Sequence, residues 1–200
     1  MAIVVILISC YISAQIFSDV TSLKIISFFG LSMDAGTLIY PITFTLRDLV
    51  HKYLGVKIAR LVIIFAAFIN LFMAGLFWIV SILPSDLNVG VQKEFSVVLS
   101  PVWRIVLASI LAEVVSELVD TEVYKAYVKR MKKKFQWMRV LISNLISVPL
   151  DSVVFAFGAF FGVFPVPVVL SIILSNVILK IIVTIFSTPL IYLIKVDRND

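Results

Sequence analysis

Long runs of apolar residues, each close to the length of a membrane-spanning helix, fill most of this 200-residue chain. A helix needs about 20 apolar residues to cross the hydrocarbon core of a bilayer. Polar or basic segments separate the runs, which together predict six helices. The expected spans are approximately 2–18, 36–50, 61–83, 101–128, 140–163 and 168–194. The expected fold is therefore an all-α polytopic membrane protein, a bundle of six transmembrane helices forming one domain over residues 1–200.

Three segments depart from a simple apolar helix. The run 36–50 contains Pro41 and ends at charged residues, which favours a kinked or broken helix. Residues 18–35 form a mixed polar stretch after the first helix. Residues 84–100 carry several polar residues and are expected to form an outer loop, with at most an interfacial turn.

Composition agrees with a membrane protein. The chain is 62% hydrophobic and 14% charged, with a mean hydropathy of +1.13. Soluble domains carry about 25% charged residues, so an ordinary soluble domain is excluded.

The positive charges are unevenly distributed and indicate an orientation. Most of the 17 Lys and Arg residues lie in 47–60, in 125–139 and in the tail after residue 194. The positive-inside rule places these segments, and with them both termini, on the cytoplasmic side. The basic run 129–134 can be interpreted as a nucleic-acid contact. A basic loop beside the membrane, attracted to anionic lipid, is much commoner, so we expect a lipid partner and no nucleic acid.

Several ionisable residues nevertheless lie inside or at the margin of the apolar runs. They are Asp48, Glu117, Asp120, Asp151 and Lys180. Insertion of such a group at the centre of a helix costs roughly 2.5–3.5 kcal/mol. A chain that keeps several of them is expected to turn them inward around something polar.

The fourth expected helix carries a polar stripe. Its members, spaced i, i+4, i+7 and i+11, are Glu113, Glu117, Asp120 and Tyr124. This spacing lines one helix face, which should point into the bundle. The structural alternative, preferred for Glu113, is that the acids only pair with Arg104, Lys125 or Lys180.

A short internal sequence repeat supports a functional interpretation. Residues 116–124 and 147–155 both fit S-x-x-x-D-[ST]-x-V-[FY], on consecutive helices of opposite direction. The second copy has Pro149 beside its acid, Asp151. Transporters place paired, interrupted elements of this kind around a site at the bilayer midplane.

Lys180 lies near the middle of the last expected helix. A buried pair with either Asp151 or Glu117 would neutralise both members. Such a pair can be purely structural, or it can break and re-form during transport. Asn144 adds an amide that both donates and accepts hydrogen bonds.

Enzymatic interpretations have little support. The single histidine excludes an H-E-x-x-H zinc site, and the sequence contains no Gly-rich phosphate loop and no nucleophile elbow. We expect no catalytic residue, no metal and no cofactor. An intramembrane hydrolase that uses only carboxylates remains the enzymatic alternative.

Four segments, in register, resemble one known family. They are residues 35–60, residues 118–124 around Asp120, residues 144–155 around Asp151, and Lys180 followed by 188–192. The chain from about residue 10 to 195 resembles the queuosine precursor transporter family, also called the vitamin uptake transporter family. Many members have glutamine where this chain has Glu117, and an acid-x-Tyr-Gly ending where it has 52–55.

The resemblance implies an importer of 7-deazaguanines such as preQ0 and preQ1, in a bacterial or archaeal cytoplasmic (inner) membrane. A carboxylate can accept the ring N–H and the amino group of a guanine-like edge together, and aromatic rings can stack on the bicycle. The implied substrate-binding residues are Phe44, Asp48, Glu117, Asp120, Tyr124, Asn144, Asp151 and Lys180. Glu117 is added because it belongs to the polar stripe, and the aromatic residues are added because they are near the acids in the sequence. Phe155 is a further candidate for stacking.

Other functional classes remain open at this stage. The chain can be the substrate-capture subunit of an ATP-driven uptake system, an intramembrane enzyme, or a structural anchor. The sequence also leaves assembly into a homo-oligomer open.

Overall fold

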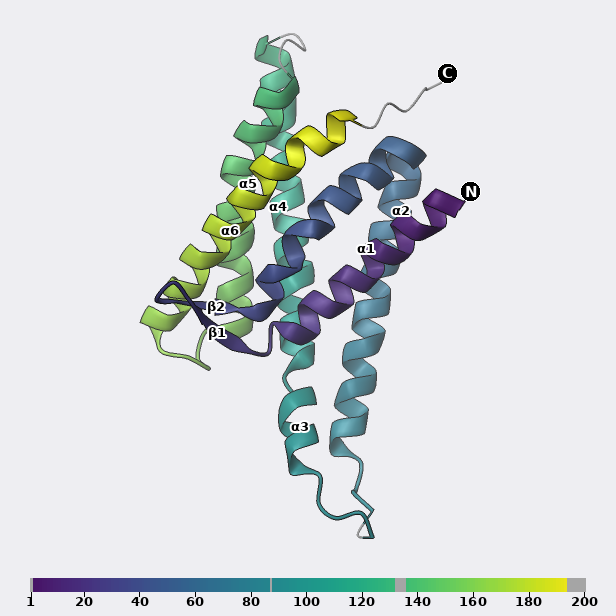
Figure 1. Ribbon diagram of the computed structural model, residues 1–200, viewed down its shortest axis with the longest axis vertical. Coiled ribbons are helices and arrows are strands. Elements are labelled where there is room, and N and C mark those ends of the chain that lie inside the picture. The colour runs from purple at the N-terminus through teal and green to yellow at the C-terminus, as the bar shows by residue number, and fades with distance from the viewer. Residues whose placement is uncertain (1, 87, 132–135, 194–200) are drawn as a thin grey trace.

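The computed structural model describes residues 2–86, 88–131 and 136–193, without the side chains of several helical residues at one end of the bundle. It is a mainly helical protein with one small β-hairpin (Figure 1). In chain order the elements are α1 (Ala2–Thr21), β1 (Ile25–Phe28), β2 (Leu31–Asp34), the 3-10 helix η1 (Ala35–Leu38), α2 (Tyr40–Ile82), α3 (Lys93–Leu99), α4 (Val102–Met131), α5 (Gln136–Phe160) and α6 (Val166–Leu193).

Helix α2 is a helical hairpin with two arms. Gly55 has φ 76° and ψ 168°, values that interrupt the helix and that a residue without Cβ adopts at no steric cost. The first arm begins at Tyr40 and covers most of the expected helix 36–50, whose first residues lie in η1, and the second arm covers the expected helix 61–83 up to Ile82. Pro41 lies in the first turn, where its missing N–H costs nothing, so the break lies at Gly55 and not at the proline.

The mixed stretch after the first helix contains the hairpin that the sequence did not predict. Helix α1 continues to Thr21, and β1 pairs antiparallel with β2, with Ile25 opposite Asp34. The hairpin is held to α6 by hydrogen bonds at Ser32: its N–H donates to Ser171 Oγ at 2.8 Å, and its carbonyl accepts from Ser175 Oγ at 2.9 Å. Because β2 runs directly into η1, this attachment fixes Asp34 beside α6.

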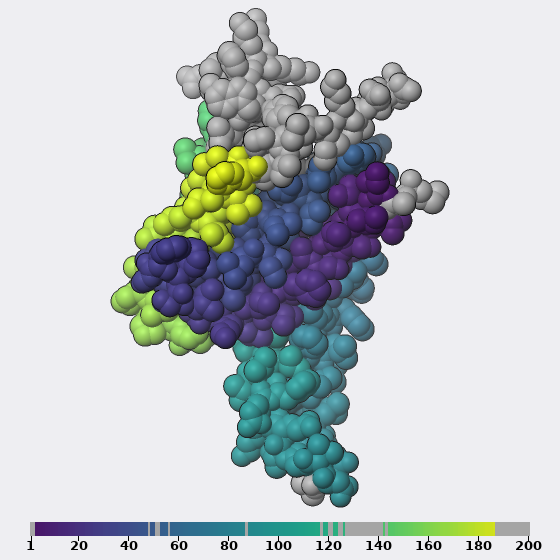
Figure 2. All heavy atoms as spheres, viewed as in Figure 1, coloured from purple at the N-terminus to yellow at the C-terminus, as the bar shows by residue number. Residues whose placement is uncertain are grey.

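The expected outer loop over 84–100 is partly helical. Helix α3 occupies Lys93–Leu99 and leads into α4, with the N–H of Ser100 donating to Ser96 and that of Arg104 to Pro101. Its apolar side chains are exposed, including Val97 at 73%. Helix α3 and the end of α2 beside it project from the rest of the bundle (Figures 1 and 2).

Small residues bring α4 and α5 into close contact. A Cβ added to Gly158 would lie 2.8 Å from Ala108 Cβ, so no larger residue fits there without a shift. Ala112, Ala156 and Ala159 belong to the same buried cluster. Close approach through small residues is characteristic of helix packing in membranes. Residues 158–162 have the small-xxx-small spacing, but only Gly158 serves this contact, because Gly162 has φ 80° and lies in the turn after α5.

Arg104 and Glu113, for the second of which a structural role was preferred, both have structural contacts. Arg104 donates to the carbonyls of Gly158 and Phe161 at 2.9 and 2.5 Å, which closes the end of α5. Glu113 accepts from Tyr11 Oη at 3.1 Å, linking α4 to α1.

By length and apolar composition, four helical segments among the described residues are long enough to cross a membrane: Ile3–Thr21, Lys57–Ile82, Lys93–Ser116 and Val166–Phe186. Asn144–Phe160 is a shorter apolar helix, and the first arm of α2 does not meet the same length and composition. Large hydrophobic side chains are exposed along these helices, such as Phe68 at 62% and Phe186 at 75%. The structure is that of a mainly helical, multi-pass membrane protein.

Several helix ends and the bend of α2 lie together at one end of the bundle. The start of α1, the bend of α2 at Gly55, the end of α4, the start of α5 and the end of α6 all lie at the same end (Figure 1). The basic segments of the sequence that fall in these elements therefore belong to one end of the molecule.

Candidate functional site

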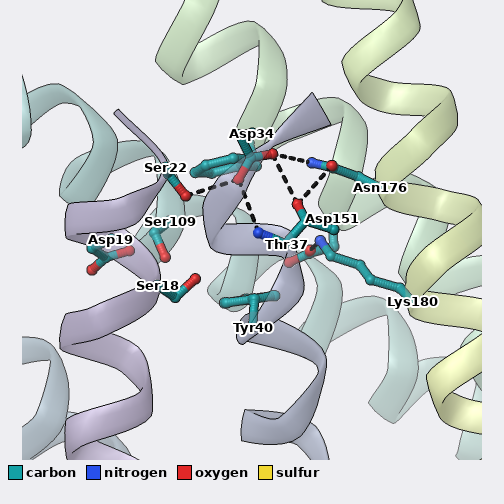
Figure 3. Close-up of a pocket in the computed structure, with 11 residues that line it drawn as sticks. Ser18, Asp19, Ser22, Asp34, Thr37, Tyr40, Ser109, Asp151, Asn176 and Lys180 are labelled. Carbon is teal, nitrogen blue, oxygen red and sulfur yellow. Dashed lines mark hydrogen bonds and ion pairs between the residues drawn. The ribbon is translucent and has the colours of Figure 1, made fainter. Parts of the chain in front are cut away.

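A small polar cavity lies inside the bundle, at the junction of α1, η1 and the helices α4, α5 and α6 (Figure 3). Its volume is about 10 Å³, room for roughly one water molecule. Its lining is Ser18, Asp19, Ser22, Asp34, Thr37, Tyr40, Ser109, Asp151, Phe155, Asn176 and Lys180. These are three acids, one base, one amide, four hydroxyl residues and two aromatic rings in an otherwise apolar protein.

Asp34 is the centre of a fully hydrogen-bonded group. The residue ends β2 and caps η1: its Oδ1 accepts from the N–H of Thr37 at 3.1 Å and from Ser22 Oγ at 2.8 Å. Its Oδ2 accepts from Asn176 Nδ2 at 2.8 Å. Each carboxylate oxygen therefore has a donor, which offsets the cost of burying Asp34 at 1% exposure.

Thr37 completes the link between η1 and α6. Its hydroxyl lies 2.6 Å from Asn176 Oδ1 and 2.9 Å from Asp34 Oδ2. A hydroxyl carries one proton and can donate to only one of these acceptors at a time. The same three side chains can thus exchange hydrogen bonds among themselves without moving apart.

Lys180 on α6 forms an ion pair with Asp151 on α5. Nζ lies 2.5 Å from Asp151 Oδ2, and both side chains are 2% exposed. The ammonium also lies 4.6 Å from the centre of the Tyr40 ring, in a cation–π contact. Of the two partners that the sequence left open for Lys180, the structure pairs it with Asp151.

Asp19 has a different environment from the other two acids of the cavity. The residue is 3% exposed, and its Oδ2 has no hydrogen-bond partner. Asp19 has Ser109 as its hydrogen-bonding neighbour. The nearby charged groups, the carboxyls of Glu113 and Asp34, have the same sign as Asp19 and repel it. It is therefore a buried acid with one oxygen unsatisfied.

A second small cavity adjoins Asp151 from the side of the first arm of α2. Its volume is also about 10 Å³, and it is lined by Phe44, Arg47, Ser116, Asn144, Ser147, Val148 and Asp151. Ser116 Oγ lies 3.4 Å from Asp151 Oδ1, and the guanidinium of Arg47 lies 5.3 Å from the centre of the Phe44 ring. Asp151 lines both cavities, so the Lys180–Asp151 pair lies between them.

The expected binding residues divide into two groups. Phe44 and Asn144 line the second cavity, Lys180 lines the first, and Asp151 lines both. The side chains of four others lie outside the described residues: Asp48, Glu117, Asp120 and Tyr124. Three matching residues of the internal repeat line the second cavity together: Ser116, Ser147 and Asp151. The side chain of Asp120 is outside the described part.

Eight of the eleven lining residues were absent from the expected site, among them Asp19, Asp34 and Thr37. These three belong to the stretch 18–35 and the turn after it, which the sequence analysis described only as mixed. The available signal was the one that singled out Asp151, an acid in a mostly apolar chain. What was missing was the hairpin, which carries Asp34 from a connecting segment into the bundle.

Comparison with known proteins assigns the chain to a family. A family model described as "Putative vitamin uptake transporter" matches residues 34–194. The chain is 26% identical over 188 residues to a protein of Bacillus subtilis (strain 168) named "Probable queuosine precursor transporter", covering 91% of this chain and 80% of that protein. No solved structure matches the chain. Since the family model covers most of the sequence, from β2 to the end of α6, this chain belongs to the vitamin uptake transporter family.

Proposed function

We propose that this protein imports a queuosine precursor, a 7-deazaguanine such as preQ0 or preQ1, across a bacterial or archaeal inner membrane. The observation that carries the proposal is the buried polar cavity between α1, η1, α5 and α6. Membership of a transporter family and the name of the Bacillus relative agree with it.

The chemistry of the cavity matches the edge of a 7-deazaguanine. The ring N–H and the exocyclic amino group of such a base are neighbouring donors, which one carboxylate can accept in bidentate fashion. Asp34 and Asp151 are two carboxylates of the cavity that accept hydrogen bonds from side chains of α6. The ring carbonyl of the base needs a donor, which Asn176 or Lys180 can supply. Tyr40 and Phe155 provide aromatic faces for the flat bicycle.

The small volume of both cavities supports a transport cycle in which the site opens when the solute binds. Sites for small molecules usually measure about 300–1,000 Å³, far more than the 10 Å³ of either cavity. The side chains of the site pair with one another, and binding exchanges these pairs for contacts with the solute. We place the Lys180–Asp151 pair at the boundary between the two cavities, where its rupture would connect them.

We further propose six spans with both termini in the cytoplasm. The two arms of α2 count as separate spans, and the basic segments of the described chain gather at the end of the bundle that holds the α2 bend. The first arm of α2 is short for a span, and burial of its inner face among the other helices compensates for that. Asp48, Glu117, Asp120 and Tyr124 remain proposed substrate contacts.

Thermal unfolding of the detergent-purified full chain tests the proposal. Stability should be measured with preQ0, preQ1, queuine, guanine and biotin. A ligand at 100 times its Kd stabilises by about 2.7 kcal/mol, which corresponds to a rise in Tm of about 5–11 °C for a chain of this size. We expect preQ0 or preQ1 to produce such a shift, and biotin none. A shift with biotin alone, or with no compound, would refute the proposal.

A matched pair of variants links the ligand to the cavity. Asn176→Leu removes the amide that contacts Asp34 and Thr37 and should abolish the ligand-induced shift. Asn88→Leu, at an exposed position between α2 and α3, should retain it. Uptake by the protein alone in proteoliposomes would further separate this proposal from a capture subunit that needs an ATP-driven module.

A further inference from the structure

The interior of the bundle holds more acid than base. Among the described side chains, the buried ionisable groups are four carboxyls, those of Asp19, Asp34, Glu113 and Asp151, and one ammonium, that of Lys180. Lys180 is engaged by Asp151. Two carboxyls of the first cavity, those of Asp19 and Asp34, thus have no basic partner within the described part of the chain.

These two carboxyls differ in how far the protein satisfies them. Asp34 receives hydrogen bonds on both oxygens, from Ser22, the N–H of Thr37 and Asn176. Asp19 Oδ2 receives none, although the residue is 3% exposed. An acid inside the bilayer without a partner is costly and usually marks a solute or ion pathway. A positive group supplied from outside the chain would remove that cost.

The position of Asp19 relative to Lys180 gives the site two ends. Asp19 comes from α1, and Lys180 and Asn176 come from α6, on the opposite side of the cavity (Figure 3). The charged neighbours that act on Asp19 are the acids Glu113 and Asp34. The α1 end of the cavity is therefore its negative end, and the hydrogen-bonding amide and ammonium lie at the α6 end.

We infer that Asp19 is the counter-ion for a protonated aliphatic amine on the transported solute. The site then selects a flat nitrogen heterocycle bearing such an amine over the neutral analogue with the same ring. Asp34, Asn176 and Lys180 hold the polar edge of the ring, and Asp19 determines the preference for the charged substituent. This inference rests on the proposed function and assigns the specificity of the same site.

Binding of two ligands with the same ring tests the inference. PreQ1 carries an aminomethyl cation, and preQ0 carries an uncharged nitrile. The Kd of each should be measured by calorimetry with the purified full chain and with Asp19→Asn. We expect the native protein to bind preQ1 about tenfold or more tightly than preQ0. Asp19→Asn should lose about 30-fold in affinity for preQ1 and less than about threefold for preQ0, since only the ion pair is removed.

The control variant is Asp86→Asn, which removes a carboxylate from an exposed position outside the bundle. It should leave both affinities unchanged. If Asp19→Asn does not fold, the N-acetyl derivative of preQ1 tests the native protein, which should bind this uncharged compound at least about tenfold more weakly than preQ1.

Each remaining outcome separates the two proposals. Equal native affinities for preQ1 and preQ0, or an equal loss of both in Asp19→Asn, would overturn the role of Asp19 and leave the nucleobase transporter intact. Binding of neither compound to the native protein would overturn the proposed function and this inference together.

Discussion

Replacement of Lys180 by methionine should strongly destabilise the protein, and a second substitution at Asp151 should restore most of the loss. The Lys180 ammonium lies 2.5 Å from the Asp151 carboxylate, with both side chains 2% exposed. Lys180→Met leaves that carboxylate buried without its counter-ion. The cation–π contact with Tyr40 is lost as well.

The magnitude follows from this geometry. Two unit charges 2.5 Å apart attract by about 7 kcal/mol at an effective dielectric constant of about 20. Desolvation of both ions offsets most of this attraction, so the net contribution of the pair is small. Removing only one partner exposes the unpaired cost, about 3–5 kcal/mol. For a chain of this length, that lowers Tm by about 6 °C or more.

Thermal unfolding in detergent is the assay, applied to Lys180→Met, Asp151→Leu and the double variant. The double variant should lie within about 2 kcal/mol of the native protein, since neither charge remains buried alone. Ser116, which lies beside Asp151, keeps its hydrogen bond to the carbonyl of Glu113 at 3.1 Å and is not left unsatisfied. Lys93→Met, at an exposed position on α3, serves as the control and should leave Tm unchanged.

Additive losses in the double variant would refute this reasoning. They would mean that Lys180 and Asp151 stabilise the bundle independently, through packing with other residues. An unchanged Tm in Lys180→Met would mean that the two side chains are not paired in the folded protein.

Two further predictions concern the contact between α4 and α5. Gly158→Ala should destabilise the protein by about 1–3 kcal/mol, because the added Cβ meets Ala108 Cβ at 2.8 Å. The matched change Gly75→Ala, where no atom lies within 4 Å, should be neutral or stabilising by up to about 1 kcal/mol. Equal unfolding temperatures for the two variants would contradict this packing. Arg104→Met should lower the free energy of unfolding by about 1–3 kcal/mol, because the carbonyls of Gly158 and Phe161 lose a charged donor at the end of α5. We expect faster amide hydrogen exchange confined to that end of α5, and unchanged exchange would count against the prediction.

The site shows how far reasoning from the sequence extends. The expectation that Asp151 and Lys180 turn inward followed from the energetic cost of an ionisable group in an apolar run. The same reasoning applied to Asp19 and Asp34, but these residues lie next to a polar connection, where a solvated position is equally reasonable. Nothing in residues 18–35 indicated that a hairpin would attach to α6 and bring Asp34 into contact with Asn176.

The sequence by itself determined the class of the protein, the positions of its long apolar helices and the clustering of its basic segments. These are local properties, because the length of an apolar run and the cost of a charge depend on neighbouring residues along the chain. The tertiary structure decided which polar groups meet: Lys180 with Asp151, Asp34 with Asn176, and Asp19 with no partner for its second oxygen. Those contacts depend on the rotation and spacing of helices, which distant contacts such as that of Gly158 with Ala108 fix, and no local pattern encodes them.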